Sequence, residues 1–258
     1  MYYPIQIPYI LSKDFSRSIR YTEEIIPHLK DFVICLWEMQ PVSEQKATAN
    51  NIIVADGCID LVVDYNEKQI GFSGMSKTNF DYKIRSPAYY YGARFKPGAF
   101  YEITNIPATE AMNTFLSIKK VDKNFNVSSF FKLPFNEIKN VFKEYISTLV
   151  QNKNSSKFTL LFDKFSNNIP ACVSEVYQIL HYSPKQCQRL FYKHFGLSPQ
   201  LSLCIIRFQK CLEIIRSGNA DANNILNILS FYDQSHFIND FKKNIGLTPL
   251  ELTRKYSS

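Results

Sequence analysis

Hydrogen-bond donors at helical spacing mark two short stretches in the C-terminal part of the chain. The first stretch has an apolar stripe formed by Cys187, Leu190, Phe191 and Phe195. Its donors lie largely on the rest of the helix surface: Lys185, Gln186, Arg189 and Lys193. In the second stretch the stripe is Phe237, Ile238, Phe241 and Ile245, which leaves for the exposed face Gln234, Ser235, His236, Asn239 and Lys243. Amide, guanidinium and ammonium groups recognise a partner by hydrogen bonds and charge.

The sequence offers little for catalysis or for metal binding. Six cysteines are scattered without a CxxC pair: Cys35, Cys58, Cys172, Cys187, Cys204 and Cys211. We interpret them as buried thiols, with a redox sensor as the alternative. The four histidines show no ligand spacing with them: His28, His181, His194 and His236. With no nucleophile–base cluster and no phosphate-binding glycine loop either, we expect no metal, no cofactor and no enzyme activity.

The two donor-rich stretches belong to an internal repeat. SPKQCQRLFYKHFGLSP (183–199) aligns without gaps with DQSHFINDFKKNIGLTP (233–249), at an offset of 50 residues. In the first copy Ser183 is suited to an N-cap, Pro184 to the first helical position and Gln186 to a capping box. Gly196 ends that helix, and Gly246 ends its counterpart.

The elements around each copy predict a helix-turn-helix. An apolar-periodic stretch precedes each copy, so each forms a short helix, a turn and a second helix with a polar outer face. Residues 199–216 form one connecting helix of roughly 18 residues, ~27 Å long. That length suits two recognition helices near the ~34 Å separation of successive major grooves. The alternative is a helical bundle whose outer polar side chains are only solvated.

Residues 156–258 resemble the DNA-binding domain of the AraC/XylS transcription regulators. FYDQSHFINDFKKNIGLTP (231–249) is similar to the signature of that family around its second recognition helix, and YSPKQCQRLFYKHFGLSP (182–199) is similar to the first helix. The resemblance implies that the following side chains face the groove: Lys185, Gln186, Arg189, Gln234, Ser235, His236 and Asn239. By geometry Arg189 suits guanine and Gln186 adenine, with a phosphate contact as the alternative for Arg189. His236 is better suited to supporting the helix or touching the DNA backbone.

Three lysines are candidates for phosphate contacts, with a solvated surface as an equal alternative: Lys193, Lys242 and Lys243. The chain also departs from the family pattern. Ser230 stands where a glycine is common in the second turn, and Asn239 where an arginine is common. The loss of that arginine leaves the base preference of the second unit open.

Charge fits this interpretation. The formal net charge is +7, and residues 156–258 carry an excess of +5 against +2 for the longer segment before them. A basic surplus suits a polyanionic partner, although a solvated surface gives the same count. The N-terminus lacks the basic start and apolar run of a signal peptide, and no segment is apolar enough to span a bilayer. We therefore expect a cytoplasmic protein without membrane contact.

Residues 1–133 are expected to form a β-rich sensor or dimerisation domain, with a cupin-like barrel as one form. Short β-branched or aromatic runs occur at 32–38, 52–55, 59–64, 69–73 and 89–95. VADGCIDLVVDY (54–65) and YGARFKPGAF (91–100) resemble the N-terminal domain of an AraC/XylS subgroup, which implies ligand sensing or dimerisation. The residues chosen for a ligand site are Trp37, Asp56, Asp60, Tyr91 and Arg94. The alternative makes Trp37 a core residue, Asp56 part of a turn and Arg94 a partner of Asp60.

Residues 134–155 are expected to form an amphipathic helix and a polar linker, QNKNSS (151–156). The apolar stripe of this helix would contact a second copy of the chain or pack onto its own domain. The fold class is α+β, with an all-α C-terminal domain at 156–258. The function we expect is a transcription regulator that binds double-stranded DNA. Further candidate partners are a small-molecule effector, a second copy and RNA polymerase; an enzyme or carrier with a helical adaptor is the alternative.

Overall fold

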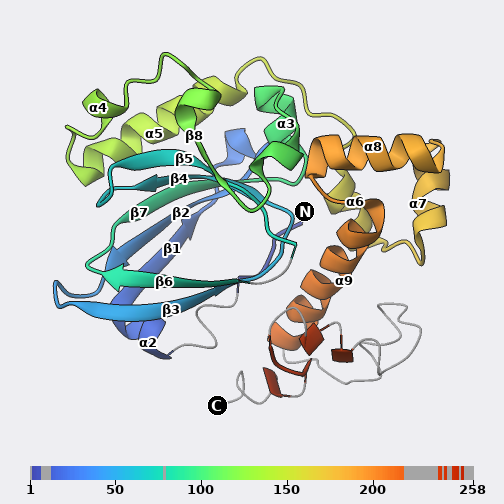
Figure 1. The fold of residues 1–258 in the computed structure, drawn as a ribbon, viewed down its shortest axis with the longest axis horizontal. Coiled ribbons are helices and arrows are strands. Elements are labelled where there is room, and N and C mark those ends of the chain that lie inside the picture. Colours follow the sequence, from blue (N-terminus) through green and yellow to red (C-terminus); the bar gives the residue numbers. More distant parts are fainter. Residues whose placement is uncertain are drawn as a thin grey trace.

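The computed structural model describes residues 2–6, 13–77 and 80–217 and, near the C-terminus, residues 238–239, 241–242, 246–249 and 251–252. Its strands are β1 (Ile19–Glu24), β2 (Val33–Pro41), β3 (Ala47–Ile53), β4 (Ile59–Asp64), β5 (Gln69–Ser73), β6 (Phe80–Ser86), β7 (Tyr90–Phe95) and β8 (Phe115–Ser117). Six of them form an antiparallel sheet in the order β1-β2-β7-β4-β5-β8. The other two, β3 and β6, pair as a ribbon opposite this sheet (Figure 1).

The cupin-like barrel that we allowed for is not what the described strands form. Strands β1 and β8 are the edges of the large sheet, and the β3–β6 ribbon is a separate two-stranded sheet. Because no hydrogen-bond ladder joins the sheet to the ribbon, the described strands do not close into a barrel. The result is an open, two-layered β arrangement, which agrees with a β-rich N-terminal domain but not with a barrel.

The two faces of the large sheet have different neighbours. Strand β4 alternates along its length: Ile59, Leu61 and Val63 are buried, whereas Asp60, Val62 and Asp64 are half-buried on the opposite face. This period of two assigns the apolar set to one side of the sheet and the acidic set to the other. The face with the aspartates is the one that the ribbon covers.

Helices cover the other face (Figure 1). They are α3 (Ala99–Thr104), α4 (Val127–Phe130) and α5 (Phe135–Val150), while α2 (Lys13–Ser18) precedes β1. Ile138, Phe142 and Ile146 of α5 are fully buried. The apolar stripe of this helix therefore packs onto its own sheet. Short 3₁₀ turns lie at η1 (Pro27–Leu29), η2 (Ala108–Ala111) and η3 (Ile118–Lys120).

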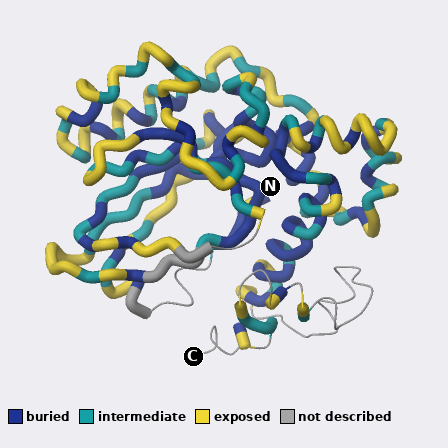
Figure 2. The backbone as a smooth tube through the Cα atoms, viewed as in Figure 1, coloured by how far each residue is buried: buried dark blue, intermediate teal, exposed yellow. Residues whose placement is uncertain are grey.

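The C-terminal helices are α6 (Leu161–Asn167), α7 (Val173–Leu180), α8 (Pro184–Phe195) and α9 (Pro199–Arg216). Figure 2 shows buried residues running from the sheet into α9, and one hydrophobic cluster includes residues from Tyr2 to Ile206. The helical part is thus packed directly on the β-rich part. Arg207 is buried in α9 and donates to the carbonyl oxygens of Pro170 and Ala171 at 2.8 and 2.7 Å, which fastens the α6–α7 connection to α9.

None of the described helices is both long and apolar enough to cross a membrane.

Candidate functional site

Helix α8 begins and ends at the residues that its sequence indicates. The Ser183 side chain accepts a hydrogen bond from the backbone N of Gln186, and Gln186 Oε1 accepts one from the backbone N of Ser183 at 3.2 Å. This reciprocal capping box satisfies amides that have no partner within the helix. Gly196 ends the helix in the left-handed conformation with φ 66°, which glycine adopts without steric cost.

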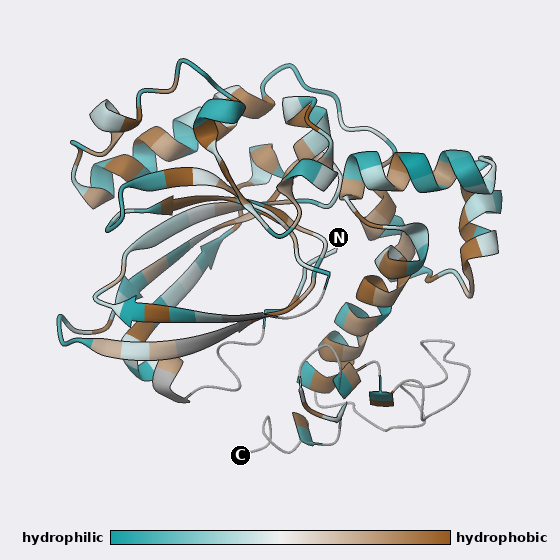
Figure 3. Cartoon of the chain, in the orientation of Figure 1, coloured by the Kyte–Doolittle hydropathy of each residue, from teal (hydrophilic) through white to brown (hydrophobic). Residues whose placement is uncertain are grey.

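One side of α8 is anchored and the other is open. Cys187, Phe191 and Phe195 are buried. The outward side carries residues that are all exposed: Lys185, Gln186, Gln188, Arg189 and Tyr192. Figure 3 shows hydrophilic residues prevailing along this helix. The sequence interpretation had passed over Gln188 and Tyr192, although Tyr192 lies seven residues from Lys185, the spacing that places two residues on one helix face.

Two α8 residues that were predicted to contact a base or a phosphate, Gln186 and Lys193, contact other protein groups in the structure. Gln186 Oε1 is engaged in the capping box, so a bidentate contact with adenine would compete with the cap. Lys193 is half-buried, and its Nζ lies 4.4 Å from the ring centroid of Tyr101 on α3. This ammonium therefore faces the β-rich part of the chain, because the last turn of α8 is turned toward α3 and η2.

His194, beside Lys193, belongs to the same contact. Its ring stacks on Phe158 with a centroid distance of 3.9 Å, and Nδ1 lies 3.2 Å from Oε1 of Glu102. Burial, with a smaller contribution from Lys193, lowers the pKa of His194 to about 4. The imidazole is neutral at pH 7, so the contact with Glu102 at this pH is not an ion pair.

Only part of the second repeat lies among the described residues. Asn239 and Lys242 are in helical segments and are exposed, and Phe241 is buried with its ring 5.5 Å from that of Phe208 on α9. The second apolar stripe therefore contacts the connecting helix at Phe241. The other candidates fall outside the described residues: Gln234, Ser235, His236 and Lys243.

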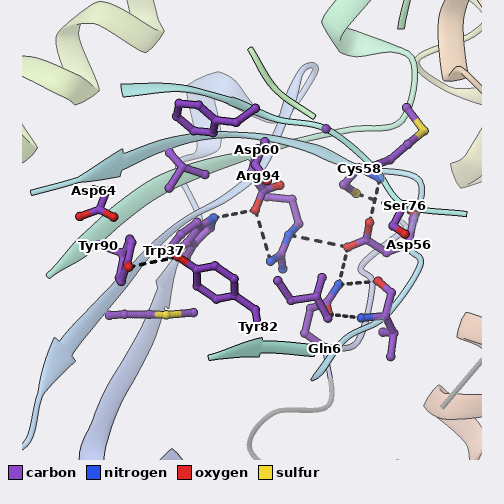
Figure 4. A pocket seen from close by; sticks show the side chains of 18 of the residues that line it. Gln6, Trp37, Asp56, Cys58, Asp60, Asp64, Ser76, Tyr82, Tyr90 and Arg94 are labelled. Atoms are coloured by element: carbon purple, nitrogen blue, oxygen red, sulfur yellow. Dashed lines mark hydrogen bonds and ion pairs between the residues drawn. The ribbon is translucent and has the colours of Figure 1, made fainter. Parts of the chain in front are cut away.

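A cavity of about 380 Å³ lies between the large sheet and the β3–β6 ribbon (Figure 4). Four of the five ligand-site candidates line it: Trp37, Asp56, Asp60 and Arg94. Aromatic rings form much of the remaining wall, contributed by Tyr21, Tyr82, Tyr90 and Phe115. A cavity of a few hundred Å³ with apolar walls and a few polar groups is typical of small-molecule sites.

Tyr91, the fifth candidate, lies on the other face of the sheet. Its ring contacts Phe142 of α5 edge-on, with centroids 5.2 Å apart, while its neighbour Tyr90 lines the cavity. Adjacent residues of a strand point to opposite faces. Of the two tyrosines, Tyr90 therefore lines the cavity, and Tyr91, the residue chosen from the sequence, does not.

Arg94 is the centre of the polar groups in the cavity. Its Nη2 lies 3.5 Å from Asp60 Oδ2, its Nη1 3.4 Å from Glu23 Oε1 and its Nε 4.0 Å from Asp56 Oδ2. Asp60 Oδ2 also accepts a hydrogen bond from Trp37 Nε1 at 2.8 Å. The pairing of Arg94 with Asp60 is therefore present, and it forms part of the cavity wall.

Burial and the neighbouring charges shift the pKa of Asp60. Burial raises the pKa of Asp60 to about 6, with Asp56 adding to the rise and Arg94 opposing it. Burial also raises the pKa of the Cys35 thiol to about 12, so this neighbour stays neutral. Asp60 is thus ionised at pH 7 at an energetic cost that Arg94 only partly offsets.

The cavity wall also touches the helical part at two places. Gln6 Nε2 donates to Asp56 Oδ2 at 2.6 Å, and the adjacent residue Ile5 donates from its backbone N to Gln209 Oε1 on α9 at 2.7 Å. Gln209 Nε2 donates to the carbonyl oxygen of Ala55 at 3.1 Å, next to Asp56. Side-chain and backbone hydrogen bonds therefore connect one end of the cavity with α9.

At the second place Met75 lies between the cavity and the end of α8. Met75 lines the cavity, and a Cβ atom at Gly196 would lie 3.3 Å from Met75 Cε and 3.0 Å from the carbonyl oxygen of Ala108. The turn after α8 is therefore in close contact with the cavity wall and with η2. Because the two are closely packed, a change in the position of Met75 would also displace the residues of this turn.

No group of three or more histidine, cysteine or acidic side chains among the described residues is arranged to hold a metal ion.

Two family models match the sequence. One, described as a helix-turn-helix domain, matches residues 177–255, and the other, described as a domain of unknown function (DUF6597), matches residues 25–117. No curated protein matches the sequence.

Several solved structures are similar to this chain. The C-terminal domain of AraT, a response regulator from Geobacillus stearothermophilus, is 23% identical, with 36% of this chain and 79% of that chain covered and a TM-score of 0.34. ToxT from Vibrio cholerae O395 bound to (E)-4-(8-methylnaphthalen-1-yl)but-3-enoic acid is 12% identical, with 93% and 100% covered and a TM-score of 0.43. ToxT from Vibrio cholerae strain SCE256 bound to an unsaturated fatty acid is 10% identical, with 92% and 93% covered and a TM-score of 0.39.

The helix-turn-helix match includes the anchored and open sides of α8, the connecting helix α9 and the second copy of the repeat. It identifies residues 177–255 as a helix-turn-helix domain. The C-terminal part is an AraC-type helix-turn-helix domain, which confirms the resemblance in the two signature stretches.

Proposed function

We propose that the protein is a sequence-specific transcription regulator that reads successive major grooves of DNA with α8 and with the second copy of the repeat. The observation that carries this proposal is the open polar side of α8, which stands opposite the buried Cys187, Phe191 and Phe195 within the matched helix-turn-helix segment. A recognition helix needs its inner side fixed by packing, so that the outer side chains meet the base edges in a defined register.

The outer side chains have separate roles in this proposal. Arg189 is exposed and offers a planar fork of donors that fits O6 and N7 of guanine. Lys185, also exposed near the start of α8, suits a phosphate. In the second copy Asn239 and Lys242 are exposed, and we assign them to adenine and phosphate contacts respectively. Helix α9 separates the two units by 18 residues.

We further propose that a small molecule in the cavity controls how the two units meet DNA. Support comes from the two contacts of the cavity wall: Asp56 is connected to α9 through Gln6 and Gln209, and Met75 lies against the turn after α8. A ligand that displaced either group would shift the relation of α8 to α9. That relation sets the spacing of the two recognition helices, and hence the affinity for a given operator.

Selection from a random pool of duplex DNA with the full-length protein tests this function. We expect an enriched motif with two elements about one helical turn apart. In Arg189→Ala, preference should be lost in one element and kept in the other, at a cost of ~1–3 kcal/mol for the preferred base. Arg20→Ala, which removes an exposed arginine of β1, is the matched control and should leave the motif unchanged. Equal relaxation of both elements by Arg189→Ala would contradict the assignment of α8 to one half-site.

A further inference from the structure

The cavity contains more negative than positive charge. Arg94 is the only basic residue among the described residues that line it, whereas Asp56, Asp60 and Asp64 line it as well. Glu23, on β1, adds a fourth carboxylate at 3.4 Å from Arg94. Carboxylates that are removed from water need a compensating cation, and the described residues here supply one guanidinium for four carboxylates, three of which lie within 4.0 Å of it.

Arg94 already lies beside three carboxylates, so it offers no net positive charge to an anionic ligand. Its side chain is 8% exposed. Nη1 and Nη2 donate to Glu23 and Asp60, and Nε lies 4.0 Å from Asp56 without a hydrogen-bond partner among the described residues. A ligand carboxylate would have to displace one of these groups or add a fifth negative charge beside them. Both alternatives cost free energy in a partly dehydrated cavity, so the charge pattern disfavours an acid.

The walls of the cavity suit a positive charge on an apolar molecule. Trp37 and Tyr21 stack with ring centroids 6.2 Å apart and planes at 17°, next to Asp60. Tyr82 and Tyr90 approach each other across the cavity, with hydroxyl oxygens 3.2 Å apart (Figure 4). Aromatic faces attract ammonium groups, and an indole attracts them most strongly. Val62, Met39 and Ile84 supply apolar surface for the rest of such a molecule.

We propose that the cavity binds a monovalent organic cation, an amine with an apolar body, whose ammonium group lies between Asp60 and the aromatic side chains Trp37 and Tyr21. This inference rests on the proposed function in taking the cavity as the effector site. The bound cation supplies the positive charge that Arg94 does not. Because the pKa of Asp60 is raised to about 6 in the absence of a ligand, binding a cation should lower it toward its usual range.

Isothermal titration calorimetry of the full-length protein at pH 7.5 tests the inference with three probes of matched shape: 4-phenylbutylammonium, 4-phenylbutanol and 4-phenylbutyrate. We expect the ammonium to bind at least about tenfold more tightly than the alcohol, and the carboxylate to bind most weakly. Trp37 is the only tryptophan in the sequence, so its fluorescence reports whether the cavity is the place of binding. The emission should change with the ammonium at the concentrations that calorimetry gives.

Two isosteric variants locate the counter-ion. Asp60→Asn keeps an acceptor for Trp37 and removes the charge, so the preference for the ammonium over the alcohol should fall about tenfold while the alcohol binds as before. Asp64→Asn removes a carboxylate farther along the same strand and should change the preference less. An equal or larger loss in Asp64→Asn would overturn the assignment to Asp60. Both variants are compared with the unaltered chain by circular dichroism and thermal unfolding.

Two results with the unaltered chain would overturn the proposed ligand class. One is tighter binding of 4-phenylbutyrate than of 4-phenylbutylammonium, and the other is no binding of any probe. Calorimetry with these probes needs no DNA, and the selection of DNA sites needs no probe. A protein that selects a DNA motif but prefers the carboxylate keeps the proposed regulatory function and loses this inference. A protein that prefers the ammonium but selects no DNA with or without it loses the regulatory function and keeps the ligand class.

Discussion

The indole of Trp37 occupies the space that a side chain at Gly92 would need. The two residues face each other in the β2–β7 ladder, and a Cβ atom at Gly92 would lie 2.4 Å from Cε2 of Trp37. The absence of that atom lets the ring lie against β7 and donate from Nε1 to Asp60. A glycine in the middle of a strand is thus what shapes this wall of the cavity.

We expect Gly92→Ala to displace the indole and to destabilise the fold by ~1–3 kcal/mol, because overpacking forces neighbouring side chains out of their rotamers. Urea unfolding monitored by circular dichroism gives the change in the free energy of unfolding, and the emission maximum of Trp37 reports the displacement. The control is the double variant Trp37→Ala/Gly92→Ala. If the cost of the alanine arises from the indole, Gly92→Ala should cost much less in the Trp37→Ala background. Equal costs in the two backgrounds would rule out this explanation.

The raised pKa of Asp60 predicts a pH-dependent stability. Burial holds the folded-state pKa of Asp60 at about 6, against the usual 3.8 of an aspartate in water, so between these pH values the folded protein binds a proton that the unfolded chain has lost. The contribution of Asp60 to stability is therefore present below about pH 4 and is lost as the pH rises through 6. Between pH 4.5 and 7.5 the wild type should lose stability relative to Asp60→Asn, as measured by urea unfolding at each pH. A constant difference would show that Asp60 does not titrate in this range.

The groups around Asp60 decide whether this pH effect can be assigned to it. They come from three strands and one loop: Arg94, Glu23, Cys35, Asp56 and Cys58. Burial raises the pKa values of both thiols, so neither loses its proton below pH 8. The comparison with Asp60→Asn cancels contributions that the other groups make equally in both proteins. Asp60 gains a proton between pH 7.5 and pH 5 and loses its negative charge. The wild type should therefore bind 4-phenylbutylammonium more weakly at pH 5 than at pH 7.5, whereas Asp60→Asn should bind it almost equally at both.

Local chemistry made α8 predictable from the sequence. Its first and last residues follow from the cap at Ser183, the proline after it and Gly196, which are all local signals. The strands β4 and β5 were predicted at their observed bounds, because their apolar runs are flanked by turn residues. Strand β6 was missed, although FDYKIRS alternates apolar and charged residues in the way that is typical of a strand with one buried face. Its pairing with the distant strand β3 could not be read from the segment itself. Its place depends on tertiary contacts that no local pattern reveals.

The cavity was predicted only in part for the same reason. Trp37, Asp56, Asp60 and Arg94 could be chosen by residue type, but no local signal decides which of Tyr90 and Tyr91 faces the ribbon. A strand that is apolar on both faces leaves its register open. Lys193 illustrates the corresponding limit on a helix. Its polar type suggested DNA, whereas its position in the last turn of α8 brings it to Tyr101.

Lys185 and Lys193 provide a matched pair on the same helix. We expect Lys185→Ala to weaken binding to the selected DNA duplex and to reduce the slope of log affinity against log salt by about 1, as for one lost phosphate contact. Lys193→Ala should leave that slope unchanged and lower the stability by ~0.5–1 kcal/mol, because its ammonium lies over the Tyr101 ring. Fluorescence anisotropy at several salt concentrations and thermal unfolding measure the two effects. A reduced salt slope in Lys193→Ala would show that this lysine turns to the DNA when the complex forms.

Gln209 should connect the occupancy of the cavity with the position of α9. It is buried, and its amide pairs with two backbone groups of the N-terminal part, the N–H of Ile5 and the carbonyl oxygen of Ala55. Gln209→Ala leaves both groups without this partner, at an expected cost of ~1–3 kcal/mol in the free energy of unfolding. Gln200→Ala, an exposed glutamine on the same helix, is the control and should cost less than ~0.5 kcal/mol.

The decisive measurement for Gln209 is the ratio of DNA affinities with and without 4-phenylbutylammonium. This ratio should approach one in Gln209→Ala and stay at the wild-type value in Gln200→Ala, because the hydrogen bonds that join the Asp56 loop to α9 are lost only in the former. An unchanged ratio in Gln209→Ala would leave the contact between Met75 and Gly196 as the remaining route between the cavity and the recognition helix.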